Sequence, residues 1–309
     1  MIPLLRWIIP AFIAATAFAQ EVPSPSPPPK KSVTVAYWNV QWFPGRRPNT
    51  TRPQELRQIE SVHRDLTRLD ADIIGMEEVR NFEQAGVAVE PLRGFKVDVC
   101  SNFPPREGQK VAQQVAIASR LQSISAWAEQ WKAGGAITPP RGFAFAAYQL
   151  APNELLLVYA LHLKSNRGGL RENITVREES IHQLLAHMEA MKQAYRKLGN
   201  LHWIIGGDFN TAPGDSRFSS ERTARDLLGH GFQWAWQNIP NESRITLPPD
   251  RLYPAACFDH IFYRGAALQH ARVLNTSPQS SDHRAIEATL DLNPETSRDL
   301  GYYSDRGHV

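Results

Sequence analysis

The residues with the clearest chemical potential follow an apolar run at residues 201–210, which reads L-H-W-I-I-G-G-D-F-N. Asp208 and Asn210 close this run. Because side chains alternate along an extended chain, both can point the same way from the strand's carboxyl end, the edge where open α/β sheets bind ligands. A carboxylate and a carboxamide placed in this way suit a hydrated metal ion and a phosphate. The alternative interpretation is an Asx-rich turn that closes the strand.

Other apolar runs also end in polar side chains. The run at 33–38 ends at an asparagine, the run at 72–76 ends at two glutamates, and the run at 155–161 delivers a histidine, a lysine and an asparagine on one face. An aspartate inside the run at 258–263 would be costly to bury alone, so we expect it to have a partner. These candidate residues are Asn39, Glu78, His162, Lys164, Asp208, Asn210, Asp259, Asp282 and His283.

Two helices separate these strands. Apolar residues recur at steps of three and four from residue 56 to 69, after Pro53 at the expected first helical position, and again from residue 173 or 175 to about 198. Strands that alternate with amphipathic helices predict a layered α/β domain.

A loop with two tryptophans is expected at residues 123–141. Trp127 and Trp131 have helical spacing, and they either form an exposed apolar platform or pack onto the body of the domain. Packing is the preferred interpretation.

Composition bounds the class of protein without naming a partner. The chain has 309 residues, 42% of them hydrophobic, with a formal net charge of +3, far from the dense basic charge of a DNA-packaging protein. Cys100 and Cys257 allow one disulfide at most, and two buried thiols are the alternative.

The first residues predict export. Residues 1–19 place one arginine before a short apolar stretch that ends in Ala17-Phe18-Ala19, which predicts a signal peptide cut after Ala19 and a secreted or periplasmic protein. An uncleaved anchor is the alternative. We expect a Pro-rich linker at 20–31, the catalytic domain at 32–293 and a polar tail at 294–309.

Six short motifs now carry a specific resemblance. They are W-N at 38–39, E-E-V at 77–79, H-L-K-S at 162–165, G-D-F-N at 207–210, F-D-H-I-F at 258–262 and S-D-H at 281–283. In this order the chain resembles the endonuclease/exonuclease/phosphatase superfamily, relatives of pancreatic-type deoxyribonucleases, abasic-site endonucleases and bacterial sphingomyelinases. The motifs span nearly all of residues 33–292.

The resemblance implies a fold and a cofactor. The expected fold is α/β, a four-layer αββα sandwich of two mostly antiparallel sheets flanked by helices. The expected activity is divalent-metal-dependent hydrolysis of phosphoester bonds with Mg²⁺, or alternatively Mn²⁺ or Ca²⁺. Glu78 would be the main metal ligand, with Asn39 and Asp282 nearby, since Mg²⁺ prefers oxygen ligands and keeps several waters.

The resemblance also implies catalytic roles. Asp259 would pair with His283 and raise its pKa, so that the imidazole acts as general base or as donor to the transition state. Asp208 and Asn210 would orient water and a phosphate oxygen, and His162 would donate to the scissile phosphate. Which of Asp208 and His283 activates the water stays open. Lys164 is the expected phosphate contact.

Position 77 departs from the family pattern, which commonly has glutamine there. Alternation along the strand predicts that Glu77 points away from the site, with Arg80 a candidate to neutralise it. If both acids faced the site, the excess negative charge would raise one pKa or recruit a second cation.

Extracellular nucleic acid is the expected substrate, and no protein partner is implied. The alternatives are a secreted phosphodiesterase of sphingomyelin or phospholipid, which would have to present Trp127 and Trp131 to the membrane lipid, and a phosphomonoesterase of small molecules. The contrasting class is a non-catalytic binding module on the same fold.

Overall fold

Two six-stranded sheets pack face to face in the computed structural model, which describes residues 32–105, 111–134, 137–251 and 253–292. The first sheet has the order β11 (Ala267–Leu274), β12 (Ala285–Asp291), β1 (Ser32–Phe43), β2 (Ile73–Val79), β4 (Gln114–Ser119) and β3 (Lys96–Cys100). The second has the order β5 (Ser123–Gln130), β6 (Gly142–Ala151), β7 (Glu154–His162), β8 (Asn200–Asp208), β10 (Asp259–Arg264) and β9 (Gln233–Trp234).

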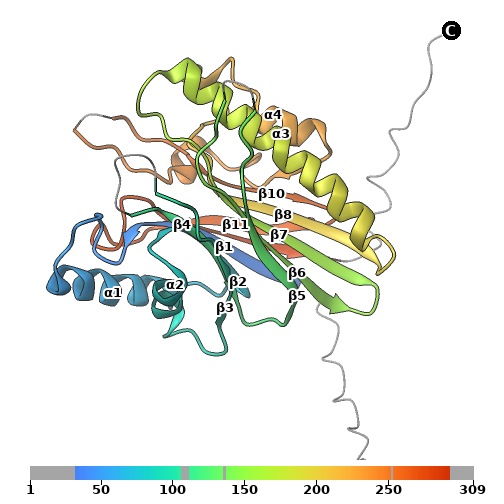
Figure 1. The fold of residues 1–309 in the computed structure, drawn as a ribbon, viewed down its shortest axis with the longest axis horizontal. Coiled ribbons are helices and arrows are strands. Elements are labelled where there is room, and N and C mark those ends of the chain that lie inside the picture. Colours follow the sequence, from blue (N-terminus) through green and yellow to red (C-terminus); the bar gives the residue numbers. More distant parts are fainter. Residues whose placement is uncertain (1–31, 106–110, 135–136, 252, 293–309) are drawn as a thin grey trace, which may run out of the picture.

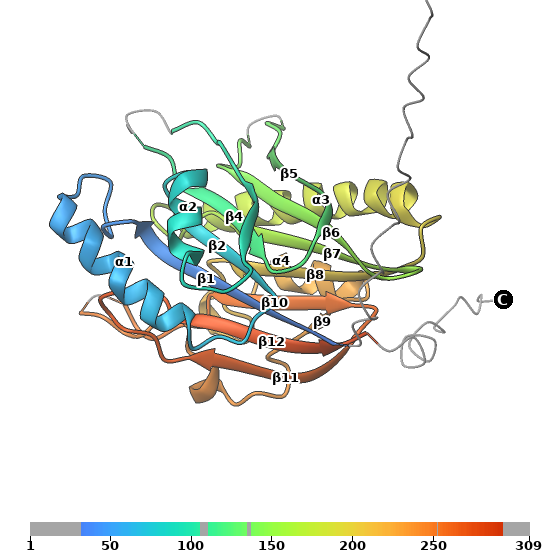
Figure 2. The ribbon, with the colours of Figure 1, turned by 90° about the horizontal axis from the view of Figure 1, so that it is seen from below.

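Helices cover the outer face of each sheet (Figures 1 and 2). The helices α1 (Arg52–Leu66) and α2 (Phe82–Val89) lie on the first sheet, whereas α3 (Leu170–Tyr195) and α4 (Thr223–Gly229) lie on the second. Two short 3₁₀ helices, Ser216–Phe218 and Asn241–Arg244, lie in the connections. This arrangement confirms the predicted four-layer αββα sandwich.

Alternation along β1 explains why the layers form. Val33, Val35 and Tyr37 face the core between the two sheets, whereas Ala36 and Trp38 face the core under α1 and α2. Both faces of this central strand are therefore apolar, as expected for a strand buried on both sides.

Strand directions bring the polar strand ends together. β1 runs parallel to β2, and β7 runs parallel to β8, while the other strand pairs within the described residues are antiparallel. In the second sheet His162 lies opposite Asp208, and Asp208 lies opposite Asp259. In the first sheet Asn39 lies opposite Glu77. The carboxyl ends of four strands thus meet at one edge of the sandwich.

The helix and loop predictions need corrections. The long helix begins earlier and ends earlier than predicted, so Leu198 lies beyond it and is 51% exposed. Helix α2 was not predicted at all. The predicted loop at 123–141 is wrong in its first half, which forms β5.

Both tryptophans of that segment pack onto the body, as the preferred interpretation had it. The Trp127 ring centroid lies 4.4 Å from that of Phe145, and Trp131, only 4% exposed, packs against Phe143 at 5.2 Å. The segment therefore forms the edge of a sheet and presents no platform of paired tryptophans to a membrane.

The predicted signal peptide, linker and polar tail lie outside the described residues. Among the residues that the structure does describe, no helix has the length and apolar character needed to cross a membrane.

Both cysteines are free thiols. Burial raises the pKa of Cys100 to about 12 and raises the pKa of Cys257 further. Since the thiolate is the reactive form, both groups are chemically quiet in the folded protein.

We therefore predict two thiols that react only after unfolding. Native protein at pH 8 should take up iodoacetamide at least tenfold more slowly than the same protein in guanidinium chloride, where two adducts per chain should appear in the intact mass. A mass showing no adduct in denaturant without reductant would indicate a disulfide and contradict the structure.

Candidate active site

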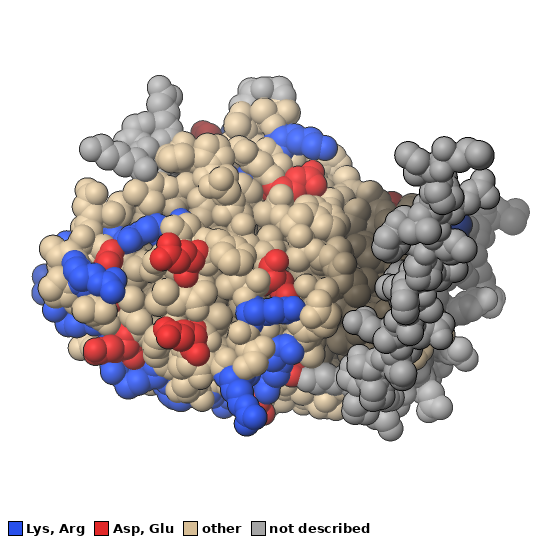
Figure 3. All heavy atoms as spheres, turned by 60° about the horizontal axis from the view of Figure 1, so that its bottom comes forward, with Lys and Arg blue, Asp and Glu red and all other residues tan. Residues whose placement is uncertain are grey.

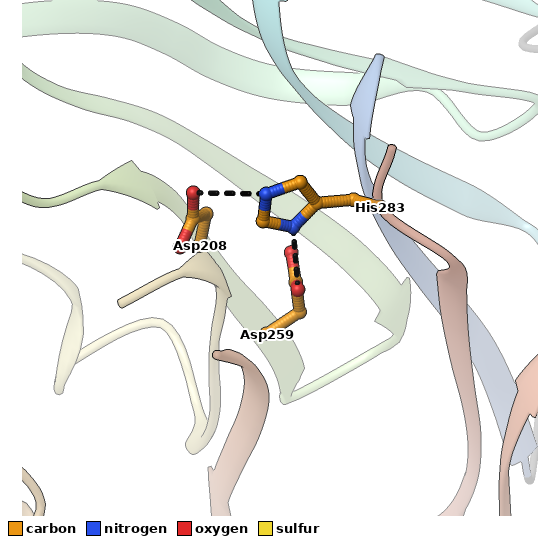
Figure 4. Close-up of side chains that lie close together, drawn as sticks. All are labelled: Asp208, Asp259 and His283. Carbon is orange, nitrogen blue, oxygen red and sulfur yellow. Dashed lines mark hydrogen bonds and ion pairs between the residues drawn. The ribbon is translucent and has the colours of Figure 1, made fainter. Parts of the chain in front are cut away.

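An acid, an imidazole and a second acid form the centre of the site (Figure 4). His283 Nδ1 donates to Asp259 Oδ2 at 2.8 Å, and His283 Nε2 lies 3.8 Å from Asp208 Oδ2. Asp208 and Asp259 are both buried, and His283 is only 8% exposed. The three side chains come from β8, the start of β10 and the segment before β12, so the two sheets meet in this contact.

Two more predicted side chains lie against Asp208. Asn39 Nδ2 donates to Asp208 Oδ2 at 3.1 Å, and His162 Nε2 lies 3.5 Å from the same oxygen. These two groups also reach Glu78 Oε1, at 3.3 Å and 3.8 Å respectively. The structure thus brings Asn39, Glu78, His162 and Asp208 into one cluster with the Asp259 and His283 pair.

An irregularity in β2 turns Glu78 toward this cluster. The pairing of β2 with β4 shifts register between Glu77 and Val79, and Glu78 has φ 63°, in the left-handed region. A non-glycine residue rarely adopts this conformation without compensation. Here the Trp42 backbone N–H donates to Glu78 Oε2 at 3.1 Å, which helps to hold the carboxylate in place.

Asn210 is held by its own backbone and by the neighbouring strand end. Its N–H donates to Asp208 Oδ1 at 2.9 Å, and its Nδ2 donates to Leu163 O at 3.2 Å. The first contact is an Asx turn, so that interpretation of this stretch is also correct. With φ 54°, Asn210 adopts a conformation that asparagine tolerates better than most residues.

Lys164 and Asp282 lie farther from the centre. Lys164 Nζ donates to the backbone oxygens of Ser165 and Arg167 at 2.8 Å and 3.0 Å, so its own loop holds the ammonium group. Asp282 is exposed, with its N–H bonded to Gln41 Oε1 at 3.2 Å. Its negative charge nevertheless acts on Glu78.

The expectation for Glu77 is wrong. Its side chain does not point away from the site but lies fully buried between the two sheets, where the charges of Asp259 and Asp208 act on it. A β-carbon at Gly207 would lie 2.7 Å from Glu77 Oε1, so the glycine makes room for the carboxyl group. Arg80 does not neutralise Glu77, because it pairs with Glu55 at 2.9 Å.

Burial decides the charge state of Glu77. Burial first, and then the carboxylates of Asp259 and Asp208, raise the pKa of Glu77 well above its ordinary value. Neither carboxyl oxygen has a hydrogen-bond partner among the described residues, and the same holds for the buried Tyr37 hydroxyl group. A neutral carboxylic acid is the form that such an environment favours.

The pKa values of Asp208 and His283 are both raised, but for different reasons. Burial raises the pKa of Asp208 to about 7, although the His283 charge and the Asn39 amide oppose the shift. For His283, burial favours the neutral ring, but the charges of Asp259 and Asp208 outweigh it and raise its pKa well above the usual value. At neutral pH the imidazole is therefore a cation held between two acids.

Glu78 and its surroundings fit a divalent cation in their chemistry. Burial and the charge of Asp282 raise the pKa of Glu78, so a cation placed between these two carboxylates would relieve their repulsion. Oxygen donors of this kind suit Mg²⁺, Mn²⁺ or Ca²⁺. Asn39 turns its Nδ2 toward Glu78, while its Oδ1 accepts from Gln41 N at 3.0 Å, so its amide would have to rotate before it ligated a cation.

Asp208, Asp259 and His283 offer a second set of possible ligand atoms, which lie within 4.8 Å of one another. The imidazole, however, already uses Nδ1 as a donor to Asp259 and carries a positive charge. A protonated ring cannot ligate a metal. Glu78 is therefore the better candidate for the metal ligand.

The sequence did not reveal two arginines around the site. Arg141 Nε donates to His162 O at 2.9 Å, and its positive charge acts on Glu78. Nothing in the predicted 123–141 loop pointed to this residue. Arg177 did leave a signal, because it falls on the buried stripe of α3 one turn before Ile181, where an apolar residue is expected.

Glu77→Gln should change the pH dependence of stability. The folded-state pKa of Glu77 is raised. Below about pH 4, near the ordinary pKa of glutamate, both the folded and the unfolded chain keep this proton, so Glu77 does not lower the unfolding free energy of the wild type there. Above that, it loses stability as the unfolded chain releases a proton that the folded chain retains. The advantage of the glutamine variant should grow with pH by up to about 1.4 kcal/mol per pH unit.

Urea unfolding of both proteins at pH 5 and pH 8, in the presence of chelator, measures this difference. Glu60→Gln removes an exposed carboxylate from α1 and serves as the matched control. An equal difference in unfolding free energy between wild type and Glu77→Gln at the two pH values would contradict the raised pKa of Glu77.

Solved structures share this fold. The chain superposes on TDP2 from Caenorhabditis elegans with TM-score 0.58 and 18% identity, covering 84% of this chain and 97% of that one. It superposes on an endonuclease/exonuclease/phosphatase family protein from Bacteroides thetaiotaomicron with TM-score 0.61 and 17% identity, covering 85% of this chain and 96% of that one. For Danio rerio TDP2 in complex with a single-strand DNA product, the TM-score is 0.57 and the identity 15%, covering 85% of this chain and 100% of that one.

A search of the curated proteins finds no significant match. The model of the Endonuclease/Exonuclease/phosphatase family, however, matches residues 36–283, from within β1 to the histidine of the acid–imidazole–acid centre. The chain therefore belongs to the Endonuclease/Exonuclease/phosphatase family.

Proposed function

We propose that this protein is an exported, divalent-metal-dependent phosphodiesterase that cleaves nucleic acid. The observation that carries the proposal is the His283 imidazole, bonded to Asp259 at 2.8 Å and facing Asp208 at 3.8 Å, beside the Glu78 carboxylate. A proton acceptor, a cationic donor and a metal-binding carboxylate in one buried cluster are the groups that phosphodiester hydrolysis requires.

Glu78 would hold the metal ion, with Asp282 close by. When bound, a divalent cation would neutralise charge on the phosphate oxygens and stabilise the leaving alkoxide. The Trp42 N–H bonds to Glu78 Oε2, and Oε1 faces the cluster, where Asn39 Nδ2 donates to it. The backbone thus fixes which carboxylate oxygen faces the cluster.

Asp208 is the better candidate for the base that activates water. A carboxylate with a pKa of about 7 can accept a proton near neutral pH, whereas His283 already carries one. His283 would instead donate from Nε2 to a phosphate oxygen, with Asp259 holding the ring through Nδ1. Since Asp208 and His283 interact, their two protons titrate as a pair.

His162 and the Asn210 carboxamide would complete the phosphate site. His162 Nε2 lies between Asp208 and Glu78, so a phosphate next to both carboxylates would meet this nitrogen. Asn210 is fixed against Asp208 through its own N–H. Both groups are hydrogen-bond donors, and donors aimed at developing charge lower the barrier.

A nucleic-acid substrate has two supports. The structure of the Danio rerio TDP2 relative contains a single-strand DNA product. The packing of Trp127 and Trp131 removes the feature on which a membrane-lipid substrate depended. On the face that Figure 3 shows, Lys and Arg are interspersed with Asp and Glu, so recognition would depend on local phosphate contacts rather than on a broad basic surface.

We predict nicking of supercoiled plasmid that requires Mg²⁺, Mn²⁺ or Ca²⁺ and stops with EDTA. His283→Ala and Asp208→Asn should each lower the rate by about 10²-fold or more, the usual range for general acid–base groups. His270→Ala on β11 and Asp70→Asn, both at exposed positions, are matched controls that should keep the wild-type rate.

The same preparation would be tested on single-stranded DNA, RNA, sphingomyelin and bis(p-nitrophenyl) phosphate. Rapid cleavage of sphingomyelin with intact plasmid would overturn the nucleic-acid substrate. Full activity in EDTA would overturn the metal requirement. Folded wild-type protein with no turnover on any of these substrates would overturn catalysis and favour a binding module.

We also predict processing at Ala19. The full chain, expressed with its own first residues in a Gram-negative host, should appear in the periplasm or medium with Gln20 as its N-terminal residue by mass spectrometry. A cell-associated protein that begins at Met1 would overturn the export proposal.

A further inference from the structure

Helix α3 carries a fully buried arginine on its apolar stripe. Arg177 is 0% exposed, one turn before Ile181 and two turns before Leu184. Its Nε and one terminal nitrogen donate to the two carboxyl oxygens of Glu221 at 2.7 Å each. This is a bidentate pair, which fixes the plane of the guanidinium group.

The other terminal nitrogen of Arg177 holds the chain that follows His162. It donates to Lys164 O at 2.9 Å and to Asn166 Oδ1 at 2.9 Å. Because a guanidinium group can only donate hydrogen bonds, Arg177 can bond only to the oxygen of the Asn166 carboxamide. The amide nitrogen of Asn166 must therefore face away from Arg177.

That amide nitrogen reaches the active-site loop after β8. Asn166 Nδ2 donates to Asn210 O at 2.8 Å, and the N–H of Asn210 donates to Asp208 Oδ1 at 2.9 Å. A continuous series of hydrogen bonds thus connects Glu221 and Arg177 through Asn166 and Asn210 to Asp208. Each contact is short and has one possible direction of donation.

We propose that Arg177, held by Glu221, is a positioning residue that fixes Asn210 through Asn166 and so sets the geometry of the phosphate site. The inference rests on the proposed function, because Asn210 and Asp208 are the groups that would meet the substrate. No hydrogen bond joins Arg177 or Glu221 directly to Asn210 or Asp208, and the hydrogen-bonded route from Arg177 to Asn210 passes through the Asn166 carboxamide.

The alternative is an ion pair that only stabilises the helix. A buried ion pair is a weak source of stability, since apolar residues of similar volume often stabilise as well or better. Ile181 and Leu184 show that this face of α3 packs well with aliphatic residues. What an apolar residue could not do is orient Asn166, and Asn210 needs such a restraint because its φ of 54° lies in the left-handed region.

Three variants separate these roles. Asn166→Ala removes the contact with Asn210 and leaves the Arg177–Glu221 pair intact. Asn166→Asp keeps an acceptor for Arg177 but loses the donor to Asn210 O. Arg177→Lys keeps the charge but loses the bidentate geometry. Arg272→Lys, which alters the 2.8 Å pair with Glu287 between β11 and β12, is the matched control.

With bis(p-nitrophenyl) phosphate, both Asn166 variants should lower kcat by about 10-fold to 100-fold, as expected for a displaced catalytic group. KM should change less than threefold, and the midpoint of Mn²⁺ activation should stay within twofold, because Glu78 has no part in this series of contacts. Arg272→Lys should keep the wild-type kcat. An unchanged kcat in both Asn166 variants would overturn the proposal.

Amide hydrogen exchange gives a readout that does not depend on activity. The Asn210 N–H should exchange at least tenfold faster in Asn166→Ala, Asn166→Asp and Arg177→Lys than in the wild type. Unchanged exchange in the Asn166 variants would overturn the proposal, even if Arg177→Lys failed to fold. If the wild type showed no turnover while the Asn210 N–H still exchanged faster in these variants, the proposed function would be overturned and the positioning role would stay supported.

Discussion

Carboxyl groups gathered in the buried interior are the constraint on which this site depends. Glu77, Asp208 and Asp259 lie between the sheets, each at most 2% exposed, and Coulomb repulsion grows as the dielectric falls. The deep acids are compensated from within, by the imidazolium of His283 and by the proton that Glu77 retains. The acids nearer the surface, Glu78 and the exposed Asp282, have less internal compensation. A divalent cation would therefore relieve repulsion between Glu78 and Asp282, near the surface, rather than among the deep acids.

Backbone conformation delivers these groups as much as side-chain type does. Glu78 and Asn210 both adopt positive φ, Glu78 at the register shift near the end of β2 and Asn210 just after β8 ends. Each such residue costs about 1–3 kcal/mol unless its surroundings impose the conformation. The surroundings here are backbone groups of neighbouring strand ends, Trp42 N on Glu78 and Leu163 O on Asn210. The strain is thus stored where the chemistry is proposed to occur.

Two arginines hold the segment between β7 and α3. Arg141 bonds the backbone oxygens of His162 and Leu163, and Arg177 bonds that of Lys164 together with the Asn166 side chain. A backbone that leaves a sheet loses its ladder partners, and buried carbonyl groups need replacement donors. Guanidinium groups supply several donors in one plane, so they can fix a short irregular segment that no strand could pair with.

The sequence alone determined which polar residues sit at strand ends, since alternation and apolar runs are local properties of the chain. It was sufficient for the layered fold, for the convergence of Asn39, Glu78, His162 and Asp208, and for the need of Asp259 for a partner. Alternation also separated Glu77 from Glu78, but it could not say what lies on the far side. In a four-layer sandwich that side is the core between the sheets rather than solvent, and only the packing of β8 onto β2 decided that Glu77 is buried beneath the site. The tertiary structure likewise decided the partners of Arg141 and Arg177, because contacts between residues 11 to 44 positions apart depend on how strands, helices and loops pack, and no local pattern encodes that.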